Sequence, residues 1–541
     1  MKTDRWGWRH VGRWLLCAVL MSGVLLSAGH AEELQPTTTE GVLRVGMEAN
    51  YAPFNWSQAD DSNGAVPISN SSGEYANGYD VWMAKKLAQA LGLELEIVKI
   101  EWDGLPPALI SGKIDAIIAG MSPTAERKEI LDFTDVYYTS DLVLVVRRNS
   151  AWADASSLSD FSGARVTGQL NTFHYGVIDQ IPGAVKETAM ESFPTMISAL
   201  ASEKIDAYVS ERPGAMAAVA ANPPLSYVAF EPGEGFDASL EDTAVAVSVR
   251  KGSPLSMRIN EALGAISEEE RQAKMQQMIL YHAGLEMSGE APAERGFFTV
   301  MGDLISEYGA LFLRGAGVTM LISVLGTVIG FVIGLFVQVL RIIPIDRKKG
   351  ALRNFMVRVL RLLLNIYIEV FRGTPMMVQA MLIYYGSKLF FGIDMSSMWA
   401  ALLIVSVNTG AYLAEVIRGG IDSVDSGQLE ACKAIGLTHG QMMRCVILPQ
   451  TIKAILPSIG NEFVVNIKDT SVLNVISVTE LFFVTKSVAG STLQIFQTYF
   501  ITAVIYLVLT LVTTRLINYI GKKNGHVKPF SLSSVTGGTE L

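Results

Sequence analysis

Residues 315–340 read GAGVTMLISVLGTVIGFVIGLFVQVL, a run of 26 residues without a charged side chain. A helix rises about 1.5 Å per residue, and the hydrocarbon core of a bilayer is about 30 Å thick. The run is therefore long enough to cross a membrane once as a helix. Stretches with no charge or a single one follow at residues 373–393, 395–414 and 487–514.

Residues 455–484 form a fifth apolar stretch, which Glu462, Lys468, Asp469 and Glu480 interrupt. Charged side chains at membrane depth face protein or a water-filled cavity, and transporters often contain such broken helices. We therefore expect a discontinuous membrane segment here. Together the five stretches predict an all-α membrane domain of about five transmembrane helices over residues 310–525.

Basic residues indicate how these helices cross the membrane. Between residues 341 and 361 seven Lys or Arg side chains accompany one acid, Asp346. Loops rich in Lys and Arg stay in the cytoplasm. The first span then enters from outside, and five spans leave residues 526–541 as a cytoplasmic tail. We expect a multi-pass protein of the cell membrane.

The preceding part of the chain has the opposite character. Residues 32–300 have a net charge of −19, against +7 for residues 301–541 and −9 for the whole chain. Strand-like apolar runs, such as residues 43–46 and 142–146, alternate with helical patterns, such as residues 80–91. This alternation predicts an α/β domain at residues 32–285, followed by a linker at residues 286–309.

The N-terminus has the pattern of a secretion signal. Arg5, Arg9 and Arg13 precede an apolar region at residues 14–26, and Gly29-His30-Ala31 resembles a cleavage site. We expect a signal peptide at residues 1–31, with an uncleaved anchor as the alternative. The α/β domain would then be extracytoplasmic. It contains no cysteine between residues 32 and 300, which excludes a disulfide framework.

Six short motifs follow one another along the α/β domain: LRVG at 43–46, YAPF at 51–54, GYDV at 78–81, WDGL at 102–105, GKID at 112–115 and AGMSPTAER at 119–127. These motifs, in this order, resemble those of the polar amino-acid solute-binding proteins of ABC importers. The resemblance implies a two-lobed, periplasmic-binding-protein-like domain of type II that closes on its ligand. We expect the chain to cross between the lobes near residues 135–140 and 225–230.

A free amino acid needs a partner for its carboxylate, for its ammonium and for its side chain. Arg127 can bind the carboxylate through its bidentate guanidinium. The resemblance implies that Glu211, where the family usually has Asp, binds the ammonium, and that Glu48 contacts the side chain. It further implies that Tyr51 and Trp102 stack on the ligand, and that Gly120, Ser122, Gln169 and Thr172 add backbone and side-chain contacts.

The class of amino acid stays open at this stage. A carboxylate at Glu48 pairs best with Lys or Arg, yet it also accepts a hydrogen bond from an amide. We favour a basic ligand, with a glutamine-like ligand next. The net negative charge of the α/β domain also favours a basic ligand, because it attracts cations through a weak long-range field.

The C-terminal part contains a second set of motifs: EVFRGTP at 369–375, AYLAE at 411–415, RGGI at 418–421, QLEACKAIGL at 428–437, ILP at 447–449 and KDTS at 468–471. These motifs resemble those of the permease subunits of the same importers. The resemblance implies a cytoplasmic "EAA" loop that docks on a separate ATPase subunit through Glu430, Ala431, Gly436 and Pro449. Cys432 replaces the usual second alanine of that loop.

No phosphate-binding G-x-x-x-x-G-K-[ST] motif occurs in the chain. We therefore expect a transport protein and no enzyme, with no catalytic or metal-binding residue, and with ATP and Mg²⁺ bound by the partner subunit. The expected partners are a free amino acid, the ATPase subunit, the lipid bilayer and a second copy of the chain, but no nucleic acid. An amino-acid-gated channel and a non-transporting sensor are the alternatives. The contiguous α/β domain disfavours the channel, and the short C-terminal tail disfavours the sensor.

Overall fold

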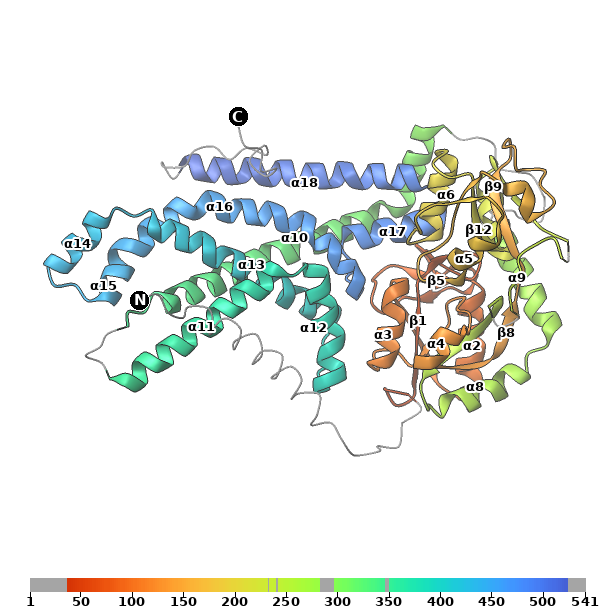
Figure 1. The fold of residues 1–541 in the computed structure, drawn as a ribbon, viewed down its shortest axis with the longest axis horizontal. Helices are drawn as coiled ribbons and strands as arrows, with labels where there is room; N and C mark the ends of the chain where they lie inside the picture. The colour runs from red at the N-terminus through yellow and green to blue at the C-terminus, as the bar shows by residue number, and fades with distance from the viewer. Residues whose placement is uncertain (1–36, 232, 240–241, 283–295, 346–349, 524–541) are drawn as a thin grey trace, which may run out of the picture.

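The computed structural model describes residues 37–523 except 232, 240–241, 283–295 and 346–349. Within these residues an α/β domain of two lobes lies at one end of an elongated helical domain (Figure 1). The predicted signal peptide and C-terminal tail lie outside the described residues. The two fold classes and their order along the chain are those that the sequence predicts.

Lobe one is built on a mixed five-stranded sheet. Strand β1 runs parallel to its neighbours β6 and β7, whereas β14 runs antiparallel to β7 and β8. In sheet order the strands are β6 (Glu94–Lys99), β1 (Val42–Met47), β7 (Ala116–Ile117), β14 (Ala244–Arg250) and β8 (Leu131–Thr139). The helices of this lobe are α2 (Tyr79–Leu91), α3 (Leu105–Ile110), α4 (Ala125–Ile130), α8 (Leu255–Gly264) and α9 (Glu268–His282).

A small antiparallel sheet extends lobe one. Its order is β2 (Asn50–Tyr51), β3 (Asn55–Gln58), β5 (Tyr75–Asn77) and β4 (Val66–Pro67). Helix α2 begins directly after β5 and buries Tyr79, Met83 and Leu87 on one face. Residues three and four apart share a helix face, so these side chains form one apolar stripe against the lobe-one core.

Lobe two has a second five-stranded sheet. In sheet order its strands are β11 (Val185–Lys186), β10 (Arg165–Thr167), β12 (Ala207–Glu211), β9 (Leu142–Arg147) and β13 (Leu225–Val228). Its helices are α5 (Phe173–Gly176), α6 (Phe193–Ala201) and α7 (Arg212–Ala221). Strand β9 is buried along most of its length, because it has sheet neighbours on both sides.

The chain crosses between the lobes twice. The first crossing, between β8 and β9, falls at Ser140, as predicted. The prediction for the second crossing is wrong: residues 225–228 form β13, which pairs with β9 inside lobe two. The chain returns only before β14, where the Ser140 N–H donates to the carbonyl of Thr243 at 3.2 Å. The two connections thus lie side by side and form one hinge.

The helical domain consists of long helices with short ones between them. Its elements are α10 (Phe297–Arg341), α11 (Ala351–Gly373), α12 (Met376–Phe391), α13 (Ser397–Asp422), α14 (Ser426–Ala434), α15 (His439–Met442), α16 (Leu448–Asp469), the 3₁₀ segment η7 (Thr470–Ile476), α17 (Leu481–Thr492) and α18 (Ile495–Lys523). Among the described residues α10, α13 and α18 are long and apolar enough to span a membrane. A fourth candidate is the broken segment from α15 to α17, bent by 57°.

The structure differs from the expected five spans at the second one. Residues 373–393 do not form one spanning helix, because the chain breaks at Thr374 and the helix that follows, α12, has only 16 residues. Pro375 restricts the preceding residue to extended conformations, and Thr374 has φ −123° and ψ 145°. The expected linker also ends early, since residues 297–309 form the first turns of α10.

Helices α10 and α13 pack closely because of small residues. A Cβ at Gly334 would lie 2.9 Å from the backbone of Ala414, and one at Gly330 would lie 2.8 Å from Thr409. Glycines four residues apart let two membrane helices approach at backbone distance. This contact forms the centre of the helical domain.

Candidate functional site

A closed cleft between the two lobes gathers every ligand-binding residue that the sequence predicts. The free space left inside the cleft is about 20 Å³, little more than one water molecule needs, so the two lobes are closed tightly on each other. Its predicted lining residues are Glu48, Tyr51, Trp102, Gly120, Ser122 and Arg127 from lobe one, and Gln169, Thr172 and Glu211 from lobe two. Phe173, His174 and Phe193 complete the lining, and the sequence reading missed all three.

Arg127 points its guanidinium into this cleft from the first turn of α4. Thr124 caps the helix by accepting a hydrogen bond from the Arg127 N–H at 3.4 Å. The guanidinium donates to the carbonyls of Ser122, at 3.0 Å, and Asn171, at 3.1 Å. Burial lowers the pKa of Arg127 to about 10, so the group stays charged at neutral pH. The result is a fixed cation at one side of the cleft.

Glu211 supplies a buried carboxylate from lobe two. It ends β12 and is 3% exposed. The Tyr51 hydroxyl donates to Glu211 Oε2, and His174 Nε2 lies 3.1 Å from Oε1. Burial alone would raise the pKa of Glu211, but His174 and the Tyr51 hydroxyl outweigh it, and the net shift is downward. Glu211 is therefore a carboxylate at neutral pH.

The two predicted aromatic residues have different surroundings. The Tyr51 ring stacks on Phe193 of lobe two, with centroids 4.4 Å apart, and on Phe54, at 5.1 Å. The Trp102 ring lies 5.2 Å from the Arg127 guanidinium and keeps an intermediate exposure. Tyr51 thus joins the lobes, and Trp102 forms the more open wall.

Glu48 is a second buried carboxylate, in lobe one directly after β1. It is 5% exposed and accepts a hydrogen bond from Asn50 Nδ2 at 3.0 Å. Burial, together with the nearby Glu101 carboxylate, raises the pKa of Glu48 to about 8, although Lys486 acts in the opposite direction. A group in this range takes up or loses a proton close to neutral pH. Its charge therefore depends on what occupies the cleft.

The remaining predicted residues shape the backbone of the site. Gly120 has φ +64°, and a Cβ there would lie 3.1 Å from the Tyr51 ring, so a side chain would be strained and crowded. The Thr172 hydroxyl donates to the carbonyl of Gln169 at 2.7 Å. Gln169 Nε2 donates to the carbonyl of Glu191 at 3.2 Å. These contacts order the start of α5, from which His174 points to Glu211.

A direct contact between the lobes lies next to the cleft. Asn171 Nδ2 donates to Asp103 Oδ1 at 2.9 Å, across the two lobes. Asn171 has φ +57°, a conformation that Asn adopts more readily than most residues. The sequence contains no signal for this pair, because each residue lies in an exposed loop and only lobe closure brings them together.

Two polar clusters attach lobe one to the helical domain. In the first, Lys99 and Glu74, 4% and 1% exposed, lie 3.5 Å apart, and both bond to the hydroxyl of Ser487 on α17. Burying this pair without hydrogen-bond partners would be costly. The shared Ser487 hydroxyl gives both charges a partner at the domain boundary.

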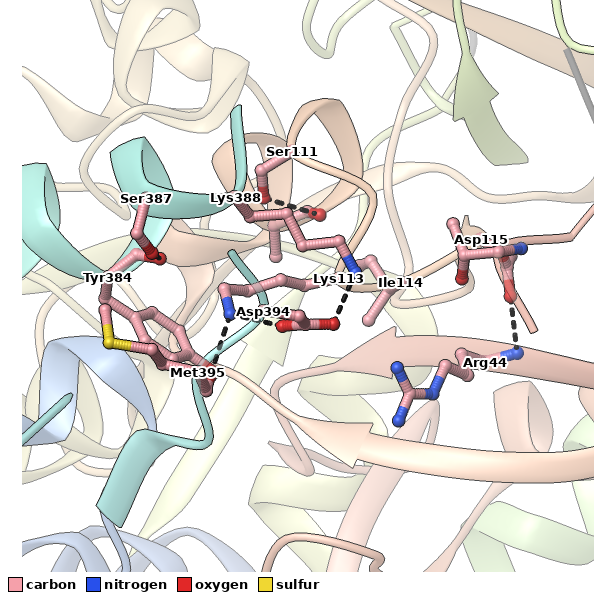
Figure 2. Close-up of polar contacts among 12 residues, drawn as sticks. Arg44, Ser111, Lys113, Ile114, Asp115, Tyr384, Ser387, Lys388, Asp394 and Met395 are labelled. Carbon is pink, nitrogen blue, oxygen red and sulfur yellow. Dashed lines mark hydrogen bonds and ion pairs between the residues drawn. The ribbon is translucent and has the colours of Figure 1, made fainter. Parts of the chain in front are cut away.

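In the second cluster, Asp394 accepts from Lys113 of lobe one at 3.0 Å and from Lys388 of α12 (Figure 2). Lys113 also donates to the carbonyl of Met395 at 3.1 Å and lies 3.7 Å from the centroid of the Tyr384 ring. Figure 2 shows that Asp394 lies between the two ammonium groups. None of these residues lines the interlobe cleft.

The residues predicted to couple to an ATPase lie at the opposite end of the molecule, around α14 and α15 (Figure 1). The side chains of Glu430 and Ala431 are exposed on α14, and Pro449 is exposed in the first turn of α16. Gly436 ends the first short helix with φ +81°, which favours glycine. Cys432 is buried against Met442 and Met443, so the two short helices pack together as one unit.

Both domains match known protein families. Residues 43–280 match the bacterial extracellular solute-binding proteins, family 3, and residues 350–526 match the binding-protein-dependent transport system inner membrane component.

Among similar proteins, the arginine transport system permease protein ArtQ of Bacillus subtilis is 32% identical over 39% of this chain and 89% of its own length. The glutamine transport system permease protein GlnP of Escherichia coli is 34% identical over 39% of this chain and 92% of its own. Among solved structures, an L-arginine-bound amino acid ABC transporter substrate-binding protein from Streptococcus pneumoniae is 26% identical, with a TM-score of 0.39 over 44% of this chain and 94% of the other.

Proposed function

The chain belongs to the amino-acid ABC importers, as a family 3 solute-binding domain fused to the inner membrane permease component, and we propose that its interlobe cleft binds a free L-amino acid with a basic side chain. The observation that carries the proposal is the meeting of one fixed cation, Arg127, with two buried carboxylates, Glu211 and Glu48, in a single closed cleft.

The three ionisable groups match the three parts of the ligand. Arg127 has two terminal nitrogens on one side of the cleft and can bind a carboxylate in bidentate fashion. Glu211, with its partners Tyr51 and His174, offers a charged acceptor for the ammonium. In every α-amino acid the carboxylate and the ammonium are attached to the same carbon. One ligand that binds Arg127 of lobe one and Glu211 of lobe two would therefore contact both lobes.

The side chain is the part of the ligand that the residues of the cleft specify least. Glu48 offers a buried carboxylate whose charged form a guanidinium or ammonium would stabilise. Glutamine is the second candidate, since its amide can donate to the same oxygen. The similar permeases divide in the same way, one being described as an arginine and the other as a glutamine transport protein.

Lobe opening would give the ligand access. It would break the contacts that join the lobes: Tyr51 to Glu211, Asn171 to Asp103, and Arg127 to Asn171. A ligand that bonds to both lobes favours the closed state by these differential contacts. The hinge at Ser140 and Thr243 is the part of the chain that would bend.

Transport would require partners beyond this chain. We assign the exposed face around Glu430 and Gly436 to a separate ATPase subunit, which would bind ATP and Mg²⁺. The simplest assembly is a homodimer, in which two helical domains form one pathway. The α/β domain would face the outside and the short helices α14 and α15 the cytoplasm, since the basic residues after α10 favour that orientation.

Reconstituted full-length protein provides the test. Calorimetry in lipid nanodiscs against the twenty amino acids should give one strong group of ligands, the basic ones. Uptake into proteoliposomes should then need ATP and the ATPase subunit. Ligand-driven ion current without ATP would support a channel, and binding without any uptake in the complete complex would support a sensor; either result would contradict import.

A further inference from the structure

Lys486 belongs to the helical domain but lies beside the ligand cleft. It projects from α17, the helix that packs on β2 and β3 of lobe one. Its Nζ lies 2.5 Å from Glu101 Oε2, and the two side chains are only 13% and 15% exposed. Unlike the Lys99–Glu74 and Asp394 clusters, this ion pair involves a residue, Glu101, that is directly adjacent to Trp102 of the cleft.

Glu101 directly precedes the short turn that carries a wall of the cleft. Trp102 follows it directly, and Gly104 ends the same turn. A Cβ at Gly104 would lie 3.0 Å from the Tyr385 hydroxyl of α12 and 3.4 Å from the carbonyl of Val475. The turn therefore lies between the cleft, which Trp102 lines, and the helical domain.

Lys486 also interacts with acids of both lobes. Besides Glu101, it lies within Coulombic range of Glu48 in lobe one and of Glu191 in lobe two. The carbonyl of Glu191 accepts the hydrogen bond from Gln169, which itself lines the cleft. The Lys486 ammonium of the helical domain thus already neutralises part of the negative potential that would attract a cationic ligand.

We propose that Lys486 is a specificity and release residue that opposes the side chain of a basic ligand. This inference rests on the proposed binding of amino acids in the cleft. Lys486 and the ligand cation would both interact with Glu48 and Glu101. Contact between lobe one and α17 therefore lowers the affinity of the cleft for arginine. A neutral ligand such as glutamine lacks the repulsion. Lys486 would thereby favour release of a cationic ligand where the cleft meets the membrane helices.

The test compares two ligands in the full-length protein in nanodiscs. For Lys486→Gln, arginine should bind about three- to tenfold more tightly than to the wild type, the range for removing one charge at several ångströms in a partly hydrated site. Glutamine affinity should change by less than about twofold. Lys486→Met, which keeps the apolar stem, should behave like Lys486→Gln, and Lys486→Arg should behave like the wild type.

Asp394→Asn is the matched control. It weakens another ion pair between lobe one and the helical domain, but the Asp394 cluster lies outside the cleft. It should leave the ratio of arginine to glutamine affinity unchanged. If it raised arginine affinity as much as Lys486→Gln does, weaker docking and not the lysine charge would explain the effect, and the inference would be overturned.

The outcomes separate this inference from the proposed function. Binding of both ligands with an unchanged ratio in Lys486→Gln and Lys486→Met would overturn the role of Lys486 alone. A wild-type chain that binds neither arginine nor glutamine would overturn the proposed ligand and this inference together.

Discussion

Replacing Glu48 by Gln removes the buried carboxylate but keeps the size of the side chain. Glu48 is 5% exposed and has one side-chain hydrogen bond, from Asn50. A hydrogen bond between charged groups contributes about 1.5–3 kcal/mol, so arginine should lose roughly 10- to 150-fold in affinity. Glutamine, which can bond to an amide as well as to a carboxylate, should lose less than about fivefold.

The pH dependence of the wild type gives a second readout of the same group. With a pKa of about 8, Glu48 is roughly one-tenth ionised at pH 7 when no ligand is present. A cationic side chain binds the ionised form, so binding must release a proton and weakens as the pH falls below 8. Arginine affinity should rise about eightfold from pH 7.0 to about 8.5, and Glu48→Gln should abolish this rise.

Isothermal titration calorimetry of the full-length protein measures both effects. Repeating the arginine titration in two buffers of different ionisation enthalpy reports the proton released on binding, which should approach one near pH 7. Equal losses for arginine and glutamine in Glu48→Gln would refute the assignment of the side-chain subsite. So would an arginine affinity that does not change over this pH range.

Three further substitutions test other parts of the molecule. Arg127→Ala removes the fixed cation and should weaken every amino acid ligand by at least about 100-fold in calorimetry; an unchanged affinity would contradict the carboxylate site. Glu430→Ala should leave ligand affinity intact but lower ligand-stimulated ATPase activity of the complex about tenfold or more, and normal uptake would exclude the coupling role. Gly490→Ala places a Cβ 2.4 Å from the Cβ of Asn50, so it should separate α17 from β2 and destabilise the docked arrangement by about 1–3 kcal/mol, seen as faster hydrogen exchange in α17. Gly419→Ala, where a Cβ meets nothing within 4 Å, is its control and should change little.

Much of the candidate site follows from the sequence, because several of the lining residues lie in short local motifs. Residues 119–127 place Gly120, Ser122 and Arg127 on one turn and the helix after it, so their proximity is a matter of local chain geometry. The lining residues Phe173, His174 and Phe193 have no such signal. Their role depends on how α5 and α6 pack against the opposite lobe, which local patterns do not specify.

Some properties add up along the chain and can be read from the amino-acid sequence alone: the length of the apolar runs, the change of net charge between the two halves, and the alternation that distinguishes an α/β domain from membrane helices. Other properties depend on the folded arrangement, namely which groups meet across the lobes and across the domain boundary, such as Asn171 with Asp103 and Lys486 with Glu101. Periodicity reports which face of an element is buried but not what it is buried against. A contact between residues hundreds of positions apart is fixed only when both elements have packed.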